Sequence, residues 1–220
     1  MSPSLPGAMI IAIDGTTASG KGTIATRLAG YFGLPHMDTG RLYRAVAISA
    51  LKHGVPLDAA GPLSDLARTL DLNDFIEHEL RSAEAGRAAS VVAAIPSVRQ
   101  ALFELQRAFA TRSGGALLDG RDIGTVIAPD ADVKLWVDAD VRERGARRWK
   151  ELVSQGATFT LDEVIQQLKT RDARDQGRSD APAQMAADAI LIDTTDLTID
   201  AAVEKAVVAV EAALVRGKTA

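Results

Sequence analysis

The residues most able to do chemistry stand together near the start of the chain. The stretch reads Gly15, Thr16, Thr17, Ala18, Ser19, Gly20, Lys21, Gly22 and Thr23. Glycines let backbone N–H groups turn toward an anion, while Lys21 can reach outer phosphates and Thr23 can serve Mg²⁺. The stretch therefore predicts a phosphate-binding loop. The alternative is a glycine-rich turn in which the lysine occurs by chance.

A strand and a helix must position this loop. Residues 9–13 are apolar and predict a buried strand, and residues 24–32 have helical spacing. A strand, a glycine-rich turn and a helix in that order are the context that a phosphate loop requires. Gly22 separates Lys21 from the hydroxyl of Thr23, an ending that resembles nucleoside monophosphate kinases more than GTPases.

A second candidate anion site lies where the next helix begins. Asp38 or Thr39 can cap this helix, Tyr43 shares a face with Thr39, and Arg44 follows directly. A capped helix start with a hydroxyl, a ring and an arginine can hold a second phosphate. A simple cap, a core tyrosine and a solvated arginine explain the same residues.

An Arg-Asp pair follows a short buried strand at 116–119. Arg121 and Asp122 lie in a turn flanked by glycines. Ligand contacts in α/β folds concentrate at the carboxyl ends of strands, which favours a functional pair over a local salt bridge.

Arginines dominate a predicted helical hairpin. The helix at 141–154 carries Arg142, Arg144, Arg147 and Arg148, and the next helix has a Thr160/Glu163 capping box and ends near 176. Its last turns and the following loop contain Arg171, Arg174, Asp175 and Arg178. The hairpin is interpreted as an anion-binding lid, because guanidinium groups match phosphate geometry. Arginines placed to suit the helix dipole are the alternative.

The remaining elements are expected to be structural. Residues 82–94 predict an alanine-rich helix on which Ser90 lies at the surface. A helix from Pro96 is expected to bury Ala101, Leu102, Leu105 and Phe109, with Arg99 and Gln106 on other faces. Strands are predicted at 133–138 and 189–193. Thr198 caps a final helix with an apolar stripe formed by Ile199, Ala202, Val203, Ala206, Val207, Val210 and Leu214.

Composition restricts the function. The 220 residues have a net charge of −4, so no global basic field favours nucleic acid. The chain contains no cysteine, which excludes disulfides and fits a reducing compartment, and its three scattered histidines do not predict a zinc site. Without a long apolar run or a leader pattern, the expected location is the cytoplasm and no membrane partner is expected. The small size fits a monomer.

Alternating strands and helices predict an α/β fold, a doubly wound parallel sheet of about five strands with the phosphate loop on its first turn. The predicted core covers about 9–56, 96–150 and 186–216. A small helical insertion is expected at about 57–95 and the Arg-rich lid at about 151–180, and residues 1–8 are expected to form a loose tail.

Four motifs together resemble the bacterial cytidylate kinases, and the resemblance covers nearly the whole chain. They are 13–23, which ends Gly-Lys-Gly-Thr, then 38–44, 119–126 and 171–175. The resemblance implies a single P-loop kinase domain of the P-loop NTPase type that moves the γ-phosphoryl of ATP, with Mg²⁺, to CMP or dCMP. The stretch at 57–95 looks shorter than in the longer members, and Thr39 stands where some members have serine.

The resemblance also implies a role for each matching residue. Residues 15–23 would hold ATP, with Lys21, Arg121, Arg171, Arg174 and Arg178 stabilising the transfer. Ser90, Arg99 and Asp122 would contact cytosine, and Asp175 would contact the sugar hydroxyls. The acceptor phosphate would be surrounded by Thr39, Tyr43, Arg44, Arg121, Arg171 and Arg178.

The reaction suits these residues, because an acceptor phosphate is already anionic and needs no general base. Two alternatives remain open. One is another small-substrate P-loop kinase, with UMP, AMP or an alcohol as acceptor. The other is a nucleotide-dependent switch, which Gly22 disfavours because such proteins usually carry Ser or Thr directly after the lysine.

Overall fold

The computed structural model describes residues 9–217, so the tail predicted at 1–8 lies outside the described residues. The chain divides into two compact units. The first contains residues up to Met37 together with those from Phe109 onward, and the second is Asp38–Ala108. The boundaries predicted for the acceptor insertion and the lid are functional divisions and stay predictions.

A five-stranded sheet forms the first unit, in the order β2-β3-β1-β4-β5. The strands are β1 (Ile10–Gly15), β2 (His36–Asp38), β3 (Ala116–Asp119), β4 (Val133–Asp138) and β5 (Ile190–Asp193). β1 pairs in parallel with β3 and β4, and β4 pairs in parallel with β5. The predicted parallel sheet is confirmed. β2 was missed because three residues are too short for a strand pattern to emerge.

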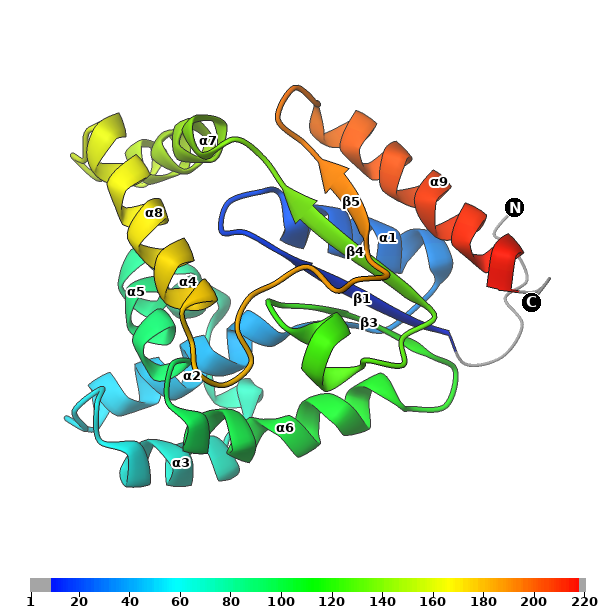
Figure 1. Cartoon of the computed structure of the whole chain (residues 1–220). Coiled ribbons are helices and arrows are strands. Elements are labelled where there is room, and N and C mark those ends of the chain that lie inside the picture. The colour runs from blue at the N-terminus through cyan, green and yellow to red at the C-terminus, as the bar shows by residue number, and fades with distance from the viewer. Residues whose placement is uncertain (1–8, 218–220) are drawn as a thin grey trace. The chain divides into compact units, whose positions relative to one another are not determined.

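The main core lies between the sheet and two helices, α1 (Lys21–Phe32) and α9 (Ile199–Gly217). Both helices lie along one face of the sheet in Figure 1 and pack against each other. Their apolar side chains meet the β1 and β4 residues that point to that face, in a cluster that includes Ile11, Ile13, Ile24, Leu28, Leu135, Val137, Ala206 and Val210. The predicted stripe of the final helix therefore packs as expected, except that Ile199 is 41% exposed at the first position of the helix.

Helices alone make up the second unit. They are α2 (Thr39–Lys52), α3 (Ala60–Arg68), α4 (Glu77–Arg81), α5 (Ala83–Val92) and α6 (Pro96–Ala110, whose last two residues belong to the first unit), with a 3-10 turn at Leu72–Asp74. α2 packs against α3, α4 and α5. No single helix in the described range 9–217 is long and apolar enough to cross a membrane. α5 and α6 satisfy that test together, but they are bent by 103°.

Two burial predictions in this unit were wrong. Leu105 is 40% exposed, whereas Arg99 and Gln106 on the same helix are 7% and 1% exposed. The buried face of α6 therefore includes polar side chains, and Gln106 Nε2 donates to the carbonyl of Leu102 at 3.0 Å. Ser90 was expected at the surface and is 3% exposed, because the alanine-rich face of α5 is itself buried.

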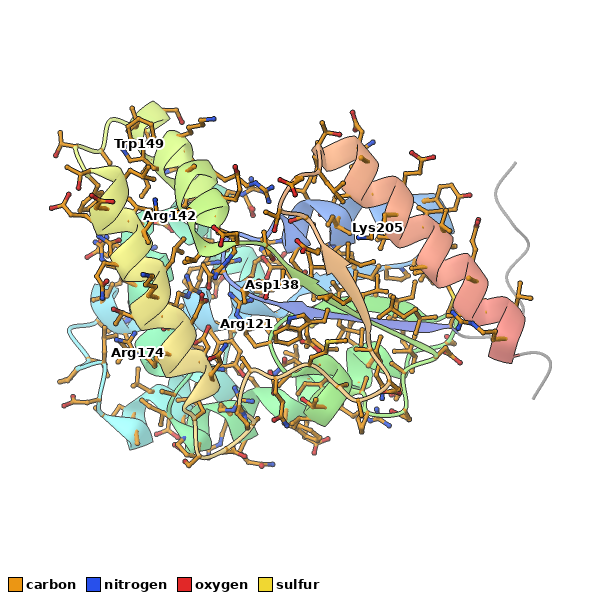
Figure 2. All side chains as sticks on the ribbon, turned by 45° about the horizontal axis from the view of Figure 1, so that its top comes forward. Arg121, Asp138, Arg142, Trp149, Arg174 and Lys205 are labelled. Atoms are coloured by element: carbon orange, nitrogen blue, oxygen red, sulfur yellow. The ribbon has the colours of Figure 1, made fainter. Side chains whose placement is uncertain are left out.

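The helices α7 (Val141–Ser154) and α8 (Leu161–Gln176) form the predicted hairpin and pack side by side. The capping box is confirmed: Thr160 N donates to Glu163 Oε2 at 2.8 Å, and Glu163 N donates back to Thr160 Oγ1 at 3.3 Å. Trp149, labelled in Figure 2, donates its indole N–H to the carbonyl of Phe159 at 2.8 Å and closes the turn. α8 ends before Gly177 as expected.

Candidate functional site

The predicted phosphate loop connects β1 to α1. Gly15 has φ +155°, and Thr16 N donates to the carbonyl of Val137 at 3.3 Å, which holds the loop against β4. Gly20 has the left-handed φ of +87° at the N-cap, and its carbonyl accepts the N–H groups of Thr23 and Ile24, each at 3.1 Å. The first turn of α1 therefore starts directly behind the loop, where its N-terminus favours a bound anion.

Lys21 is only 8% exposed and ion-pairs with Asp119, the last residue of β3. Asp119 is 1% exposed, and its second oxygen accepts a hydrogen bond from His36 Nε2 at 2.7 Å. Burial alone would raise the pKa of Asp119, but the charge of Lys21 and the hydrogen bond from His36 lower that pKa to about 2. The phosphate-loop lysine is thus held by an ionised carboxylate.

Asp14 stands just before the loop and fixes the turn that follows Asp122. Its two carboxylate oxygens accept the backbone N–H groups of Ile123 and Gly124, at 2.8 and 2.7 Å. Those residues begin a π-helical turn, η2 (Ile123–Ile127), that the sequence did not predict. Burial raises the pKa of Asp14 to about 7, although the two N–H donors act in the opposite direction.

Arg121 joins the phosphate loop to α8. Its Nη2 donates to Thr17 Oγ1 at 2.8 Å, and its Nε donates to Asp175 Oδ2 at 3.1 Å. Arg178 Nη2 donates to the other oxygen of Asp175 at 2.5 Å, and Asp175 is 3% exposed. Asp138, labelled in Figure 2, is the last residue of β4, and its Oδ1 accepts the hydroxyl of Thr16 at 2.6 Å. Arg121 and Arg178, which were expected from different parts of the sequence, therefore meet at Asp175.

Two arginines of α7 form contacts that hold neighbouring segments in place, a role that sequence reasoning did not assign to them. Arg144 is 6% exposed, and its Nη1 donates to the Thr17 carbonyl at 3.1 Å and to Asp172 Oδ2 at 2.6 Å. Arg147 donates to the hydroxyl and carbonyl of Thr194, at 3.0 and 2.6 Å. These contacts tie the hairpin to the phosphate loop and to the segment after β5.

The other predicted residues of the first unit lie on the same elements. Asp122 is 5% exposed at the start of η2. On α8, Arg171 is half-buried, and Arg174, labelled in Figure 2, is exposed.

The second unit contains the other predicted acceptor residues, which are Thr39, Tyr43, Arg44, Ser90 and Arg99. Of these, all but Arg44 are less than 9% exposed. Asp38 is the N-cap residue of α2 but makes no cap hydrogen bond through its side chain, so that part of the capping prediction was wrong. Its carboxylate instead accepts from Arg44 Nη2 at 2.5 Å. The arginine next to the predicted anion site is therefore held by a carboxylate within its own helix start.

Sequence reasoning assigned no role to the carboxylates at the ends of the strands. Four strands end in or next to an aspartate: Asp14, Asp119, Asp138 and Asp193. The strands themselves were predicted, and their carboxyl ends lie at one edge of a parallel sheet, so this signal was available. His36 and Arg144 had no comparable signal, because their partners are distant in the sequence.

The geometry therefore combines a phosphate loop with a lysine, several carboxylates, of which Asp119 is ionised, and several guanidinium groups. Such a set can bind polyanions and neutralise a phosphoryl group in transfer. Comparison with known proteins agrees, since the family model for cytidylate kinase matches residues 11–212. The chain belongs to the cytidylate kinase family.

Relatives support this membership over the full domain. A cytidylate kinase of Methylocella silvestris is 54% identical over 205 residues, covering 93% of this chain and 95% of the relative. A cytidylate kinase of Cereibacter sphaeroides is 52% identical over 208 residues, covering 94% and 98%. A solved structure of an uncharacterized Eubacterium ventriosum protein has a TM-score of 0.55 at 13% identity, covering 92% of this chain and 98% of that chain, and supports the fold alone.

Proposed function

We propose that this chain transfers the γ-phosphoryl group of ATP to CMP or dCMP, giving ADP and CDP or dCDP. Family membership supports this activity, since the relatives are cytidylate kinases at about half identity. The observation that carries the proposal within the structure is the convergence of Arg121 on Thr17 of the phosphate loop and on Asp175 of α8. The groups proposed to bind the donor and those proposed to bind the acceptor thereby share one hydrogen-bond network.

ATP phosphates would occupy the loop formed by residues 15–23. The N–H groups at the start of α1 and the ammonium group of Lys21 would neutralise their charge. Lys21 is paired with Asp119 here, so binding of ATP would exchange one anionic partner for another. The pair with Asp119 holds the lysine in position before the donor arrives.

Mg²⁺ fits this site as a cation held mainly by the substrate. Within residues 9–217 no group of three His, Cys, Asp or Glu side chains is placed to hold a metal ion. Mg²⁺ commonly keeps several waters and binds through phosphates plus one or two protein oxygens. The exposed hydroxyl of Thr23 would supply one such oxygen. When bound, Mg²⁺ would add positive charge beside the transferring phosphoryl group.

The acceptor phosphate would be met by guanidinium groups. Arg121 and Arg178 are both held by Asp175, and Arg171 lies on the same helix as that aspartate. Their forked donors match phosphate oxygens, and Arg174 is the exposed member of the set. These arginines would lower the repulsion between the two polyanions, and no general base is needed because the attacking oxygen is already anionic.

The family also assigns roles in recognising the nucleoside. Asp122 would accept from the cytosine amino group, and Asp175 would accept from the sugar hydroxyls. Ser90 and Arg99 would contact the base, and Thr39, Tyr43 and Arg44 would contact the acceptor phosphate. The family resemblance supports these assignments, and most of the side chains concerned are buried polar groups.

A coupled ADP-release assay over CMP, dCMP, UMP, AMP and GMP tests the proposal. We expect turnover with CMP and dCMP and little with the others. Arg121→Ala should lower kcat at saturating CMP by roughly 100-fold while ATP affinity changes little, because the lost donor acts on the transfer. Arg142→Ala, which changes an exposed arginine of α7 labelled in Figure 2, is the matched control.

Turnover with UMP or AMP in place of CMP would instead favour the alternative kinase. The monomeric state and the cytoplasmic location also stay predictions, which gel filtration and cell fractionation can test.

A further inference from the structure

We propose that His36 is a positioning residue for ATP binding. It shares the charge of Asp119 with Lys21, and so sets how readily Lys21 exchanges Asp119 for the phosphates of ATP. The inference rests on the proposed function for the identity of the donor. It concerns a residue that none of the recognised motifs includes.

The geometry divides the carboxylate of Asp119 between two donors. Its Oδ2 pairs with the Lys21 ammonium group, and its Oδ1 accepts from His36 Nε2 at 2.7 Å. A carboxylate this far below its usual pKa is ionised and accepts only, so the proton in the second contact belongs to the imidazole. Nε2 carries a proton in the cation and in one neutral tautomer, so the contact does not require His36 to be charged.

Backbone pairing places the imidazole where it can reach that oxygen. His36 begins β2, and the carbonyl before it, that of Pro35, accepts the N–H of Leu117 at 2.9 Å. Leu117 lies two residues before Asp119 on β3. The side chain of His36 is 20% exposed and that of Asp119 is 1% exposed, so water has little access to the carboxylate. A buried carboxylate oxygen that lost its donor would be costly.

The consequence for Lys21 follows from competition. A carboxylate that accepts a hydrogen bond from a second donor attracts the ammonium group less strongly than a carboxylate whose only donor is the lysine. If His36 no longer donates, Asp119 retains Lys21 more strongly. ATP phosphates must then compete with a tighter internal ion pair, so donor affinity falls while acceptor affinity is unaffected.

Side-chain variants with different reach test this role. His36→Gln keeps an amide Nε2 donor at similar reach, whereas His36→Asn is polar but too short and His36→Leu lacks a donor. We expect Kd and KM for ATP to rise roughly 10-fold in His36→Asn and His36→Leu, from the loss of one charge-assisted hydrogen bond. His36→Gln should stay within about 2-fold of wild type, and KM for CMP should stay constant in all three.

Two controls separate positioning from general damage. His53→Leu changes an exposed histidine at the end of α2 and should leave ATP affinity unchanged. In a Lys21→Met background, His36→Asn should cause no further loss of ATP affinity, because the competing ammonium group is gone. Additive losses in that background would contradict the proposal.

Equal impairment of His36→Gln and His36→Asn would overturn the role, as would a parallel rise in KM for CMP. Titration with ATP alone keeps the two proposals distinguishable. If the expected ATP effects appear but CMP is not phosphorylated, the proposed acceptor fails while the role of His36 stands. If CMP is phosphorylated and ATP affinity does not change in the His36 variants, the proposed acceptor stands and the role of His36 fails.

Discussion

At the scale of single residues, Thr17 connects the phosphate loop to two guanidinium groups. Its carbonyl accepts from Arg144 and its hydroxyl accepts from Arg121, at 3.1 and 2.8 Å. Each arginine also pairs with an aspartate of α8, Asp172 and Asp175 respectively. A shift of this one loop residue would therefore move both arginines, which makes the loop conformation and the charge of the site interdependent.

Gly15 makes the closest approach in this loop. A Cβ added there would lie 2.0 Å from the Val137 carbonyl oxygen, at a φ of +155°. Gly15→Ala should destabilise the fold by about 3 kcal/mol or more, because neither backbone can move aside. Gly22→Ala is the matched control, since nothing lies within 4 Å of its added Cβ. Urea unfolding of both variants measures the difference, and similar midpoints would contradict this reading.

Asp122 offers a residue-scale test of base selection. Under the proposed function its carboxylate accepts from the cytosine amino group, where uracil presents a carbonyl oxygen. Asp122→Asn should reduce the ratio of kcat/KM for CMP over UMP by roughly 10- to 100-fold, the range expected when a buried acceptor loses its matching donor. Competition assays with both nucleotides measure this ratio. A variant that discriminates like the wild type would remove Asp122 from base reading.

At the scale of elements, α7 and α8 behave as one unit tied to the phosphate loop. Arg144 of α7 pairs with Asp172 of α8, with side chains 7% and 14% exposed. Gly145 allows the helices to approach, because an added Cβ would lie 2.4 Å from Ile165 Cγ1. The hairpin therefore carries its arginines on a packed scaffold.

Breaking the Arg144–Asp172 ion pair should lower the free energy of unfolding. Arg144→Met should cost about 3 kcal/mol, because it leaves a largely buried carboxylate without its charge partner. Combining it with Asp172→Leu should cost less than the sum of the single changes. Arg148→Met serves as control, since its pair with Glu151 is more exposed and should be worth less than about 1 kcal/mol. Strict additivity in urea unfolding would argue against a coupled pair.

At the scale of the whole molecule, the parallel sheet gathers carboxylates that are distant in sequence. Asp14, Asp119 and Asp138 come from the ends of three neighbouring strands, and each holds a different part of the site. The pKa values of two of these carboxylates diverge. The pKa of Asp119 falls to about 2, whereas burial raises the pKa of Asp14 to about 7.

Asp14 should therefore make stability depend on pH. Its raised pKa means that the folded state binds the proton more tightly than the unfolded state. The resulting stability is fully present below about pH 4 and is lost as pH rises through about 7. The loss amounts to at most about 4 kcal/mol. Urea unfolding of wild type and Asp14→Asn between pH 4 and 8 isolates this contribution, and a difference that stays flat would mean that the two N–H donors keep Asp14 ionised throughout.

Local patterns in the sequence determined the elements of the first unit. Apolar runs predicted β1, β3, β4 and β5, and the Thr160/Glu163 capping box and Gly177 bounded α8, because these signals act within a few residues. The phosphate loop and the family resemblance also came from short motifs. β2 and η2 could not be predicted in this way, since a three-residue strand and a π-turn held by Asp14 depend on remote backbone contacts.

Tertiary structure alone decided which charged groups are partners. The sequence placed Arg144 in an arginine-rich helix without assigning it a partner, yet Arg144 is buried against Thr17 and Asp172. It gave no reason to connect His36 with Asp119, which is 83 residues away. Hydrogen bonds and ion pairs act over a few ångströms in space and are indifferent to separation along the chain, so only the folded sheet determines where each carboxylate meets its donor.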